Sequence, residues 1–132
     1  MTYDRSTSTT YALTYSEDNN KNVLAKLDLS NGEMTAVGEV SEVSSNRSFL
    51  TFSSDGNGHI YTISTDGNLY VIDTATGVSA LVGATGVMPR YIQSAYYNTD
   101  TSTLWWAAAL PAGKGSLDTV AVNTRAATLV AA

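Results

Sequence analysis

The chain has 132 residues, 43% of them apolar and 14% charged, which suits a single folded domain over 1–132. Its net charge of −5 and its scattered Lys and Arg residues argue against nucleic acid as a partner, because phosphate-binding surfaces need clustered basic side chains. Cysteine is absent, which excludes disulfides and thiolate metal sites, and no apolar run is long enough for a transmembrane segment.

The first unit of the chain, about residues 1–40, combines a hairpin with a second turn. The hairpin runs from Tyr3-Asp4 to Tyr11 through Ser and Thr residues that favour turns. The second turn is the phrase 27–32 (LDLSNG), and a strand-like tail follows it at 34–38. Because Asp and Gly are typical of tight turns, the unit is predicted to hold four short strands.

The second unit, about residues 48–83, repeats both phrases in the same order. The sequence predicts strands at 49–53, 60–64, 69–73 and 79–82. Its second phrase, 72–77 (IDTATG), lies 45 residues after the first, and we expect Gly77 to adopt a positive φ. Asp28 and Asp73 recur at one position, where a carboxylate is expected to accept hydrogen bonds from turn amides.

The third unit, about residues 91–131, is a more divergent copy. Its hairpin runs from Tyr97-Asn98 to Trp105, and its second phrase, 120–125 (VAVNTR), follows 48 residues after the previous one. Ala121 and Arg125 stand in place of the Asp and the Gly, so we expect a turn of another type here.

Three units of four strands, with no sustained helical spacing of apolar residues, predict an all-β fold. A four-stranded meander of about 40 to 50 residues is typical of a β-propeller blade. We therefore expect three four-stranded antiparallel propeller-type blades, the alternative being twelve strands of a sandwich or barrel. Propellers hold about four to eight blades, so these three are expected to form part of a larger or oligomer-completed β-propeller, such as a ring of two copies.

The stretches 69–77 (LYVIDTATG) and 80–83 (ALVG) resemble the LYxIDxxTGxxxxVG repeats of Bacteroidetes-type cell-surface β-propeller proteins, and 85–95 is similar to that group as well. The resemblance implies an extracellular or cell-envelope location, an interaction role and no catalytic residues. A looser similarity to quinoprotein repeats lacks their closing tryptophan. The residues at the start, Thr2 to Arg5, are polar and unlike a signal peptide.

The first ligand-binding candidates lie in loops that join an outer strand to the next inner strand, because such loops converge on the central funnel of a propeller. Arg47 and Arg90 fall within one residue of each other when the units are aligned, and Tyr91 and Gln93 lie on the same predicted face. Ordinary solvated loop residues are the alternative interpretation.

Trp105 and Trp106 are the remaining ligand-binding candidates. Neighbours in a strand point to opposite faces, so one tryptophan is expected to pack between blades while the other is available to stack on a sugar or a partner. The alternative is that both pack in the interior.

Catalytic and metal sites find little support in the sequence. His59 is the only histidine, and it stands beside a turn, where a solvated side chain is the simpler interpretation. Glu17-Asp18 and the turn 55–58 (DGNG) offer oxygen ligands for calcium, but the second lacks the later carboxylate of a calcium loop. We therefore expect no catalytic residues, no cofactor and no metal.

Three functions remain open. The first is a non-enzymatic interaction or scaffold module of a bacterial surface or secreted protein. The second is a carbohydrate-binding propeller module, and the third is a fragment of a propeller enzyme. The expected partner is a protein or a glycan, together with a second copy or the remaining blades of a parent protein at the uncovered blade faces.

Overall fold

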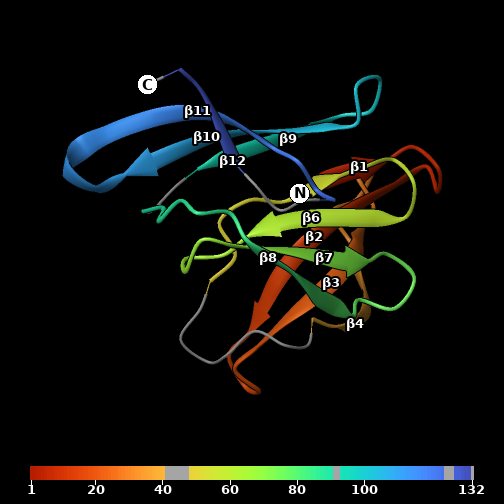
Figure 1. Ribbon diagram of the computed structural model, residues 1–132. Coiled ribbons are helices and arrows are strands. Elements are labelled where there is room, and N and C mark those ends of the chain that lie inside the picture. Colours follow the sequence, from red (N-terminus) through yellow and green to blue (C-terminus); the bar gives the residue numbers. More distant parts are fainter. Residues whose placement is uncertain (41–47, 91–92, 124–126, 132) are drawn as a thin grey trace.

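The structure is a computed structural model that describes residues 1–40, 48–90, 93–123 and 127–131. It contains three four-stranded sheets, each an antiparallel meander of strands that follow one another in sequence. Apart from a single 3-10 turn, η1 (Pro111–Gly113), the described residues form no helix. The prediction of an all-β fold with three four-stranded propeller-type blades is confirmed (Figure 1).

The four strands of each blade follow one another along the chain. Blade 1 holds β1 (Thr2–Asp4), β2 (Thr9–Ser16), β3 (Lys21–Leu27) and β4 (Met34–Glu39). Blade 2 holds β5 (Ser53–Ser54), β6 (His59–Ile63), β7 (Asn68–Asp73) and β8 (Ser79–Ala84). Blade 3 holds β9 (Ser94–Asn98), β10 (Thr103–Leu110), β11 (Lys114–Val120) and β12 (Ala127–Ala131).

Corresponding residues pair in the first hairpin of all three blades, although the turn of blade 2 is shorter. The pairs at equivalent positions are Thr2 with Tyr11, Ser53 with Tyr61, and Tyr96 with Trp105. Two residues further along each inner strand, a side-chain oxygen accepts a hydrogen bond from a backbone N–H of the turn; the three residues are Asp4, Asp55 and Asn98. Short acceptor side chains favour turns for this reason.

The second turn of blades 1 and 2 also has the predicted chemistry. Asp28 accepts a hydrogen bond from the Ser30 N–H, and Asp73 accepts one from the Ala75 N–H, each at 2.8 Å. Gly77 has a φ of 78°, which confirms the expected left-handed conformation. The turn with Arg125 lies outside the described residues.

Alternating side chains build two cores, one in each space between neighbouring blades. The core between blades 1 and 2 consists of Tyr11, Leu24, Val40, Ile60 and Ile72. The core between blades 2 and 3 consists of Ile63, Leu69, Leu104, Trp106, Ala108 and Val120. Blade 2 is therefore buried on both faces, while blades 1 and 3 each have one face that no other described sheet covers.

The inner strands are linked side by side through one repeated hydrogen bond. Thr2 Oγ1 accepts from the Ser54 N–H at 2.9 Å, and at the next step Ser53 Oγ accepts from the Tyr97 N–H at 2.8 Å. Thr2 and Ser53 are equivalent in the hairpin register, and so are Ser54 and Tyr97. The three sheets thus fan out around β1, β5 and β9, as the blades of a propeller do (Figure 1).

The outer parts of blades 1 and 2 meet backbone to backbone. A side chain added at Gly77 would lie 2.8 Å from the carbonyl oxygen of Gly38, and one added at Gly38 would lie 2.1 Å from the carbonyl oxygen of Thr76. Glycine at both positions therefore lets β4 approach the β7–β8 turn more closely than any larger residue could.

One predicted strand differs from the structure. Residues 49–53 do not form a continuous inner strand: Phe49 makes an isolated bridge to Ser64, and β5 covers only Ser53–Ser54. The reason lies in Thr51, whose Oγ1 accepts the Ile63 N–H at 2.9 Å. A side-chain oxygen thus takes the position of a backbone acceptor and interrupts the ladder.

Within the described residues, no helix has both the length and the apolar character needed to cross a lipid bilayer.

Candidate functional site

The three inner strands form a shared groove, which we call the inner groove. Each of β1, β5 and β9 is the first strand of its sheet, so one of its edges pairs with no strand of the same sheet. Such edges present backbone N–H and C=O groups to the groove. Two of these N–H groups, of Ser54 and Tyr97, already donate to Thr2 Oγ1 and Ser53 Oγ. The inner groove has a hollow at each end, and both hollows take residues from all three blades.

The larger hollow, which we call the Gln93 hollow, has a volume of about 400 Å³. Its lining combines apolar and polar side chains: Met1, Leu13, Phe49, Leu50, Thr51, Phe52, Gln93, Ser94 and Ala95. It lies at the beginning of the inner strands, where the outer strand of one blade connects to the next blade. That is the side of the molecule on which the sequence predicted a binding site.

Gln93 is held in place by three hydrogen bonds. Its Oε1 accepts from the Trp106 indole Nε1 at 2.6 Å, and its Nε2 donates to the carbonyl oxygens of Arg90 and Ala109 at 3.2 and 3.4 Å. The structure therefore brings two of the predicted residues, Gln93 and Trp106, into direct contact. The amide satisfies a buried indole and fixes the loop before β9, so Gln93 forms part of the wall of the hollow.

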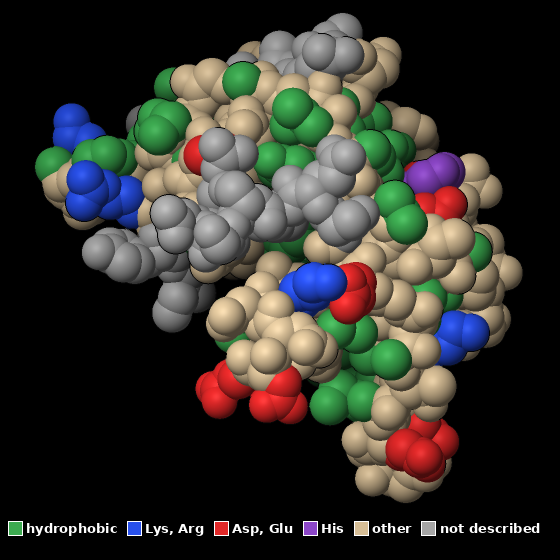
Figure 2. All heavy atoms as spheres, turned by 90° about the horizontal axis from the view of Figure 1, so that it is seen from below, with side chains coloured by type: hydrophobic (Ala, Val, Ile, Leu, Met, Phe, Trp, Pro, Cys, Tyr) green, Lys and Arg blue, Asp and Glu red, His purple; other side chains and the backbone are tan. Residues whose placement is uncertain are grey.

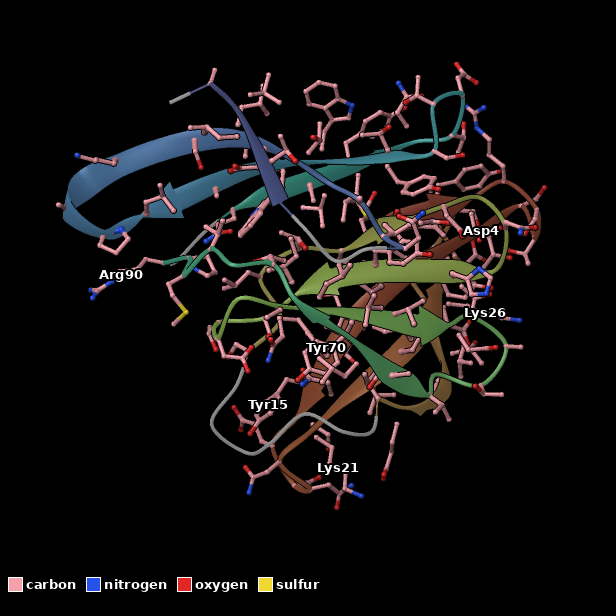
Figure 3. All side chains as sticks on the ribbon, in the orientation of Figure 1. Asp4, Tyr15, Lys21, Lys26, Tyr70 and Arg90 are labelled. Atoms are coloured by element: carbon pink, nitrogen blue, oxygen red, sulfur yellow. The ribbon has the colours of Figure 1, made fainter. Side chains whose placement is uncertain are left out.

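The other predicted residues are distributed differently. Arg90 is exposed, and its side chain points away from the body of the molecule at the edge of blade 3 (Figure 3). Its N–H donates to the carbonyl oxygen of Ala109 at 2.7 Å. Arg47 and Tyr91 lie outside the described residues.

The two tryptophans separate as the strand geometry requires. Trp106 is completely buried between blades 2 and 3, so it is removed from the ligand-binding candidates. Trp105 points to the opposite face of blade 3, where it is partly exposed next to its cross-strand partner Tyr96, which is 64% exposed. Only one of the two indoles is thus able to contact a ligand.

The smaller hollow, which we call the Tyr96 hollow, has a volume of about 240 Å³ at the other end of the inner groove. Tyr3, Tyr96 and Tyr97 line it together with Arg5 and Thr99, among others. The sequence analysis did not select Tyr3, Tyr96 or Arg5. Their positions beside the first turn of the aligned units could have indicated that they converge.

A buried carboxylate stabilises this end of the groove. Asp4 is fully buried, and its Oδ2 accepts hydrogen bonds from Ser54 Oγ at 2.9 Å and from the Gly58 N–H at 3.1 Å, both in the next blade. Its Oδ1 accepts from Ser6 Oγ and the Thr7 N–H of its own turn. Burial alone raises the pKa of Asp4, but these four hydrogen bonds outweigh it and lower the pKa to about 2.

A tyrosine pair lies between blades 2 and 3. The rings of Tyr61 and Tyr97 are stacked with centroids 5.7 Å apart and an angle of 15° between their planes. Burial, followed by the nearby Asp55 carboxylate and Tyr97, raises the pKa of Tyr61 above its usual value. Tyr61 therefore packs against the Tyr97 ring as an apolar group whose own hydroxyl is neutral at physiological pH.

The described residues contain no cluster of three or more His, Asp or Glu side chains that could hold a metal ion. His59 lies at the start of β6, as expected, with its Nδ1 3.0 Å from Asp55 Oδ2, and Figure 2 shows the histidine beside an acidic side chain. Asp55 already accepts the Asn57 and His59 N–H groups. Its carboxylate thus has local roles in the turn.

Comparisons with known proteins identify the architecture. The three blades superpose with a TM-score of 0.70 and 14% identity on a chain of the crystal structure of a nidogen/laminin complex, covering 98% of this chain and 46% of that one. They also superpose on a protein of unknown function from Bacteroides thetaiotaomicron, with a TM-score of 0.75, 10% identity, and coverage of 97% and 32%. These structures are β-propellers. The likeness shows a propeller fold.

The chain spans about a third to a half of the length of these structures. No family model matches the chain, and no curated protein matches it either.

Proposed function

We propose that the chain is a non-enzymatic interaction module that binds a polypeptide segment of a protein partner in the Gln93 hollow. The observation that carries this proposal is the hollow of about 400 Å³ formed by all three blades. It combines apolar side chains such as Leu50 and Phe52 with Thr51, Ser94 and the start of the inner strand β9. The exposed lining is mainly polar, which suits an extended peptide, because such a peptide needs partners for its own backbone groups.

An extracellular or cell-envelope location is part of the proposal, and it is supported by the similarity of 69–77 to bacterial surface propeller repeats. Further blades, from a second copy or from a longer parent protein, are proposed as additional partners at the uncovered faces of blades 1 and 3.

The experiment fills the hollow with a large side chain. Ser94 is exposed and lines the Gln93 hollow, so Ser94→Trp should block it, whereas Ala80→Trp places the same side chain on the exposed outer strand β8 as a matched control. The immobilised wild type and both variants are incubated with envelope and secreted proteins of the source organism. A protein retained by the wild type and Ala80→Trp but not by Ser94→Trp supports the proposal. Equal retention by all three contradicts it.

Glycan binding is the second candidate function, and it rests on Trp105 and Tyr96, two neighbouring aromatic side chains that are at least partly exposed. Aromatic faces of this kind can stack on sugar rings. A glycan array separates the two candidates: binding that Trp105→Ala abolishes and Ser94→Trp leaves unchanged would favour the sugar. A panel of hydrolase substrates tests the non-enzymatic part of the proposal, which turnover above that of a heat-denatured control would contradict.

A further inference from the structure

The uncovered faces of blades 1 and 3 correspond to the two opposite sides of the interface that recurs between neighbouring blades. In both interfaces seen in the structure, a blade turns one particular face toward the blade that follows it. This face carries Tyr11 in blade 1 and the equivalent Tyr61 in blade 2. Tyr11 thus packs in the core with blade 2, and Tyr61 packs against the core with blade 3. The equivalent residue of blade 3 is Trp105, which has no following blade among the described residues.

Blade 1 leaves the opposite kind of face uncovered. Its core residue Tyr11 points to blade 2, so the neighbours Thr10 and Ala12 point away from that core. Their cross-strand partners, Leu27 and Ala25, share this face. In blade 3 the equivalent face carries Leu104 and Trp106 and is packed against blade 2. Blade 1 thus has the face that receives a preceding blade, and blade 3 has the face that receives a following one.

The aromatic pair between blades 2 and 3 has unpaired equivalents on these two faces. Tyr61 of one blade stacks on Tyr97 of the next. By register, Trp105 is equivalent to Tyr61 and Tyr3 is equivalent to Tyr97. Tyr3 is 54% exposed and Trp105 is partly exposed, and in the described part of the chain neither ring stacks on another aromatic ring.

The two faces also complement each other in size. Blade 3 offers the bulky indole of Trp105, and at the facing positions blade 1 offers the small, partly exposed side chains Thr10 and Ala12. Large side chains pack well where the opposite surface is small, because close packing leaves few voids.

We propose that a second copy of this chain closes the propeller, with Trp105 of each copy stacking on Tyr3 of the other. One copy supplies both kinds of face, so two copies related by a two-fold axis cover all four uncovered faces at once and form a ring of six blades. The nidogen/laminin chain supports this size, because the three blades correspond to 46% of that longer propeller chain.

The buried area is sufficient for a stable dimer. Four strands spaced about 4.8 Å apart, each about five residues long, cover roughly 320 Å² per face. The four faces in the two interfaces then total about 1,300 Å², within the range of roughly 1,200–2,000 Å² for specific complexes. The dimer also completes the inner groove, which the described residues of one copy border with three inner strands. This proposal uses surfaces other than the Gln93 hollow and does not depend on its ligand.

The first test is the mass in solution, measured by light scattering after size exclusion at micromolar concentration. The wild type should have twice the 13.9 kDa of one chain, independent of concentration. Trp105→Glu should reduce the mass to one chain, while Tyr15→Glu, at an exposed tyrosine on the other face of blade 1, should leave the dimer intact. A wild-type monomer, or a mass that rises steadily with concentration as in an open chain of copies, would overturn the closed ring.

The second test keeps both aromatic rings and so does not depend on the folding of Trp105→Glu. Ile63 and Trp106 share the core between blades 2 and 3, and Ala107 and Ala12 are their equivalents at the proposed interface. Because the natural chain has no cysteine, Ala107→Cys and Ala12→Cys each carry a single thiol. A short bis-maleimide should join the two variants only when they are mixed. If the mixture yields no covalent dimer, the proposal is contradicted. A monomer that binds a glycan through Trp105 would give this result.

Discussion

Asp4 is expected to make the stability of the protein depend on pH through the link between blades 1 and 2. The fully buried carboxylate accepts five hydrogen bonds, two of them from Ser54 and Gly58 in blade 2. Its pKa in the folded protein is about 2, against an ordinary value of 3.8. A difference of this size corresponds to about 2 kcal/mol at about 1.4 kcal/mol per pKa unit.

The direction of this pH dependence follows from the lowered pKa of Asp4. The unfolded state takes up a proton at higher pH than the folded state, so the contribution is fully present above about pH 4 and is lost as the pH falls towards about 2. Asp4→Asn removes the charge and directs an NH₂ group at N–H and O–H donors, so at pH 7 it should lower the free energy of unfolding by about 2 kcal/mol. The difference between wild type and variant should shrink towards zero near pH 2.

Urea denaturation at pH 7, 4, 3 and 2, at a fixed protein concentration, measures this directly. Asp28→Asn is the matched control, because Asp28 is exposed and its pKa is lowered only by hydrogen bonds from Ser30 within its own turn. It should change stability much less. Parallel curves for the wild type and Asp4→Asn between pH 4 and 2 would refute the reasoning.

Three further predictions concern packing within and between the blades. Gly77→Ala should cost more stability than Gly32→Ala, although the two glycines have nearly the same φ, 78° and 77°. The reason is that a side chain at Gly77 meets Gly38, whereas one at Gly32 meets nothing within 4 Å. We expect about 1 kcal/mol for Gly32→Ala and about 2–4 kcal/mol for Gly77→Ala from thermal melts, and equal costs would contradict the close backbone contact. Thr62→Val should leave the melting temperature unchanged or raise it, since Thr62 Oγ1 is buried without a hydrogen-bond partner in the described structure; a loss above about 1 kcal/mol would show that the hydroxyl has a partner. Gln93→Leu should lower stability by about 1–3 kcal/mol by leaving the Trp106 indole N–H unsatisfied, and unchanged tryptophan fluorescence and stability would argue against that bond.

The features that the sequence predicted correctly are local ones. The Asp28 and Asp73 turns and the positive φ of Gly77 depend on residues within a few positions of each other, and their chemistry is visible in the phrase itself. The repetition of these phrases then defines the blades, because a meander needs only neighbouring strands to pair. Strand alternation likewise predicted that Trp105 and Trp106 point to opposite faces.

The features that the sequence did not predict arise from contacts between distant residues. Nothing near Asp4 indicates that Ser54 and Gly58 will donate to it from the next blade. Alternation could not show which tryptophan is buried, because that depends on which face of blade 3 meets blade 2. Thr51 interrupts the predicted strand at 49–53 because its hydroxyl competes with a backbone acceptor, a choice made in three dimensions.

The central claim, that three propeller-type blades are completed by a second copy, is tested most directly by small-angle X-ray scattering of the unmodified chain. A closed ring of two copies predicts twice the 13.9 kDa of one chain and a radius of gyration of about 18 Å, both constant over a tenfold range of micromolar concentration. The mass of one chain with a radius of gyration of about 14 Å would contradict the claim, as would values that grow continuously with concentration.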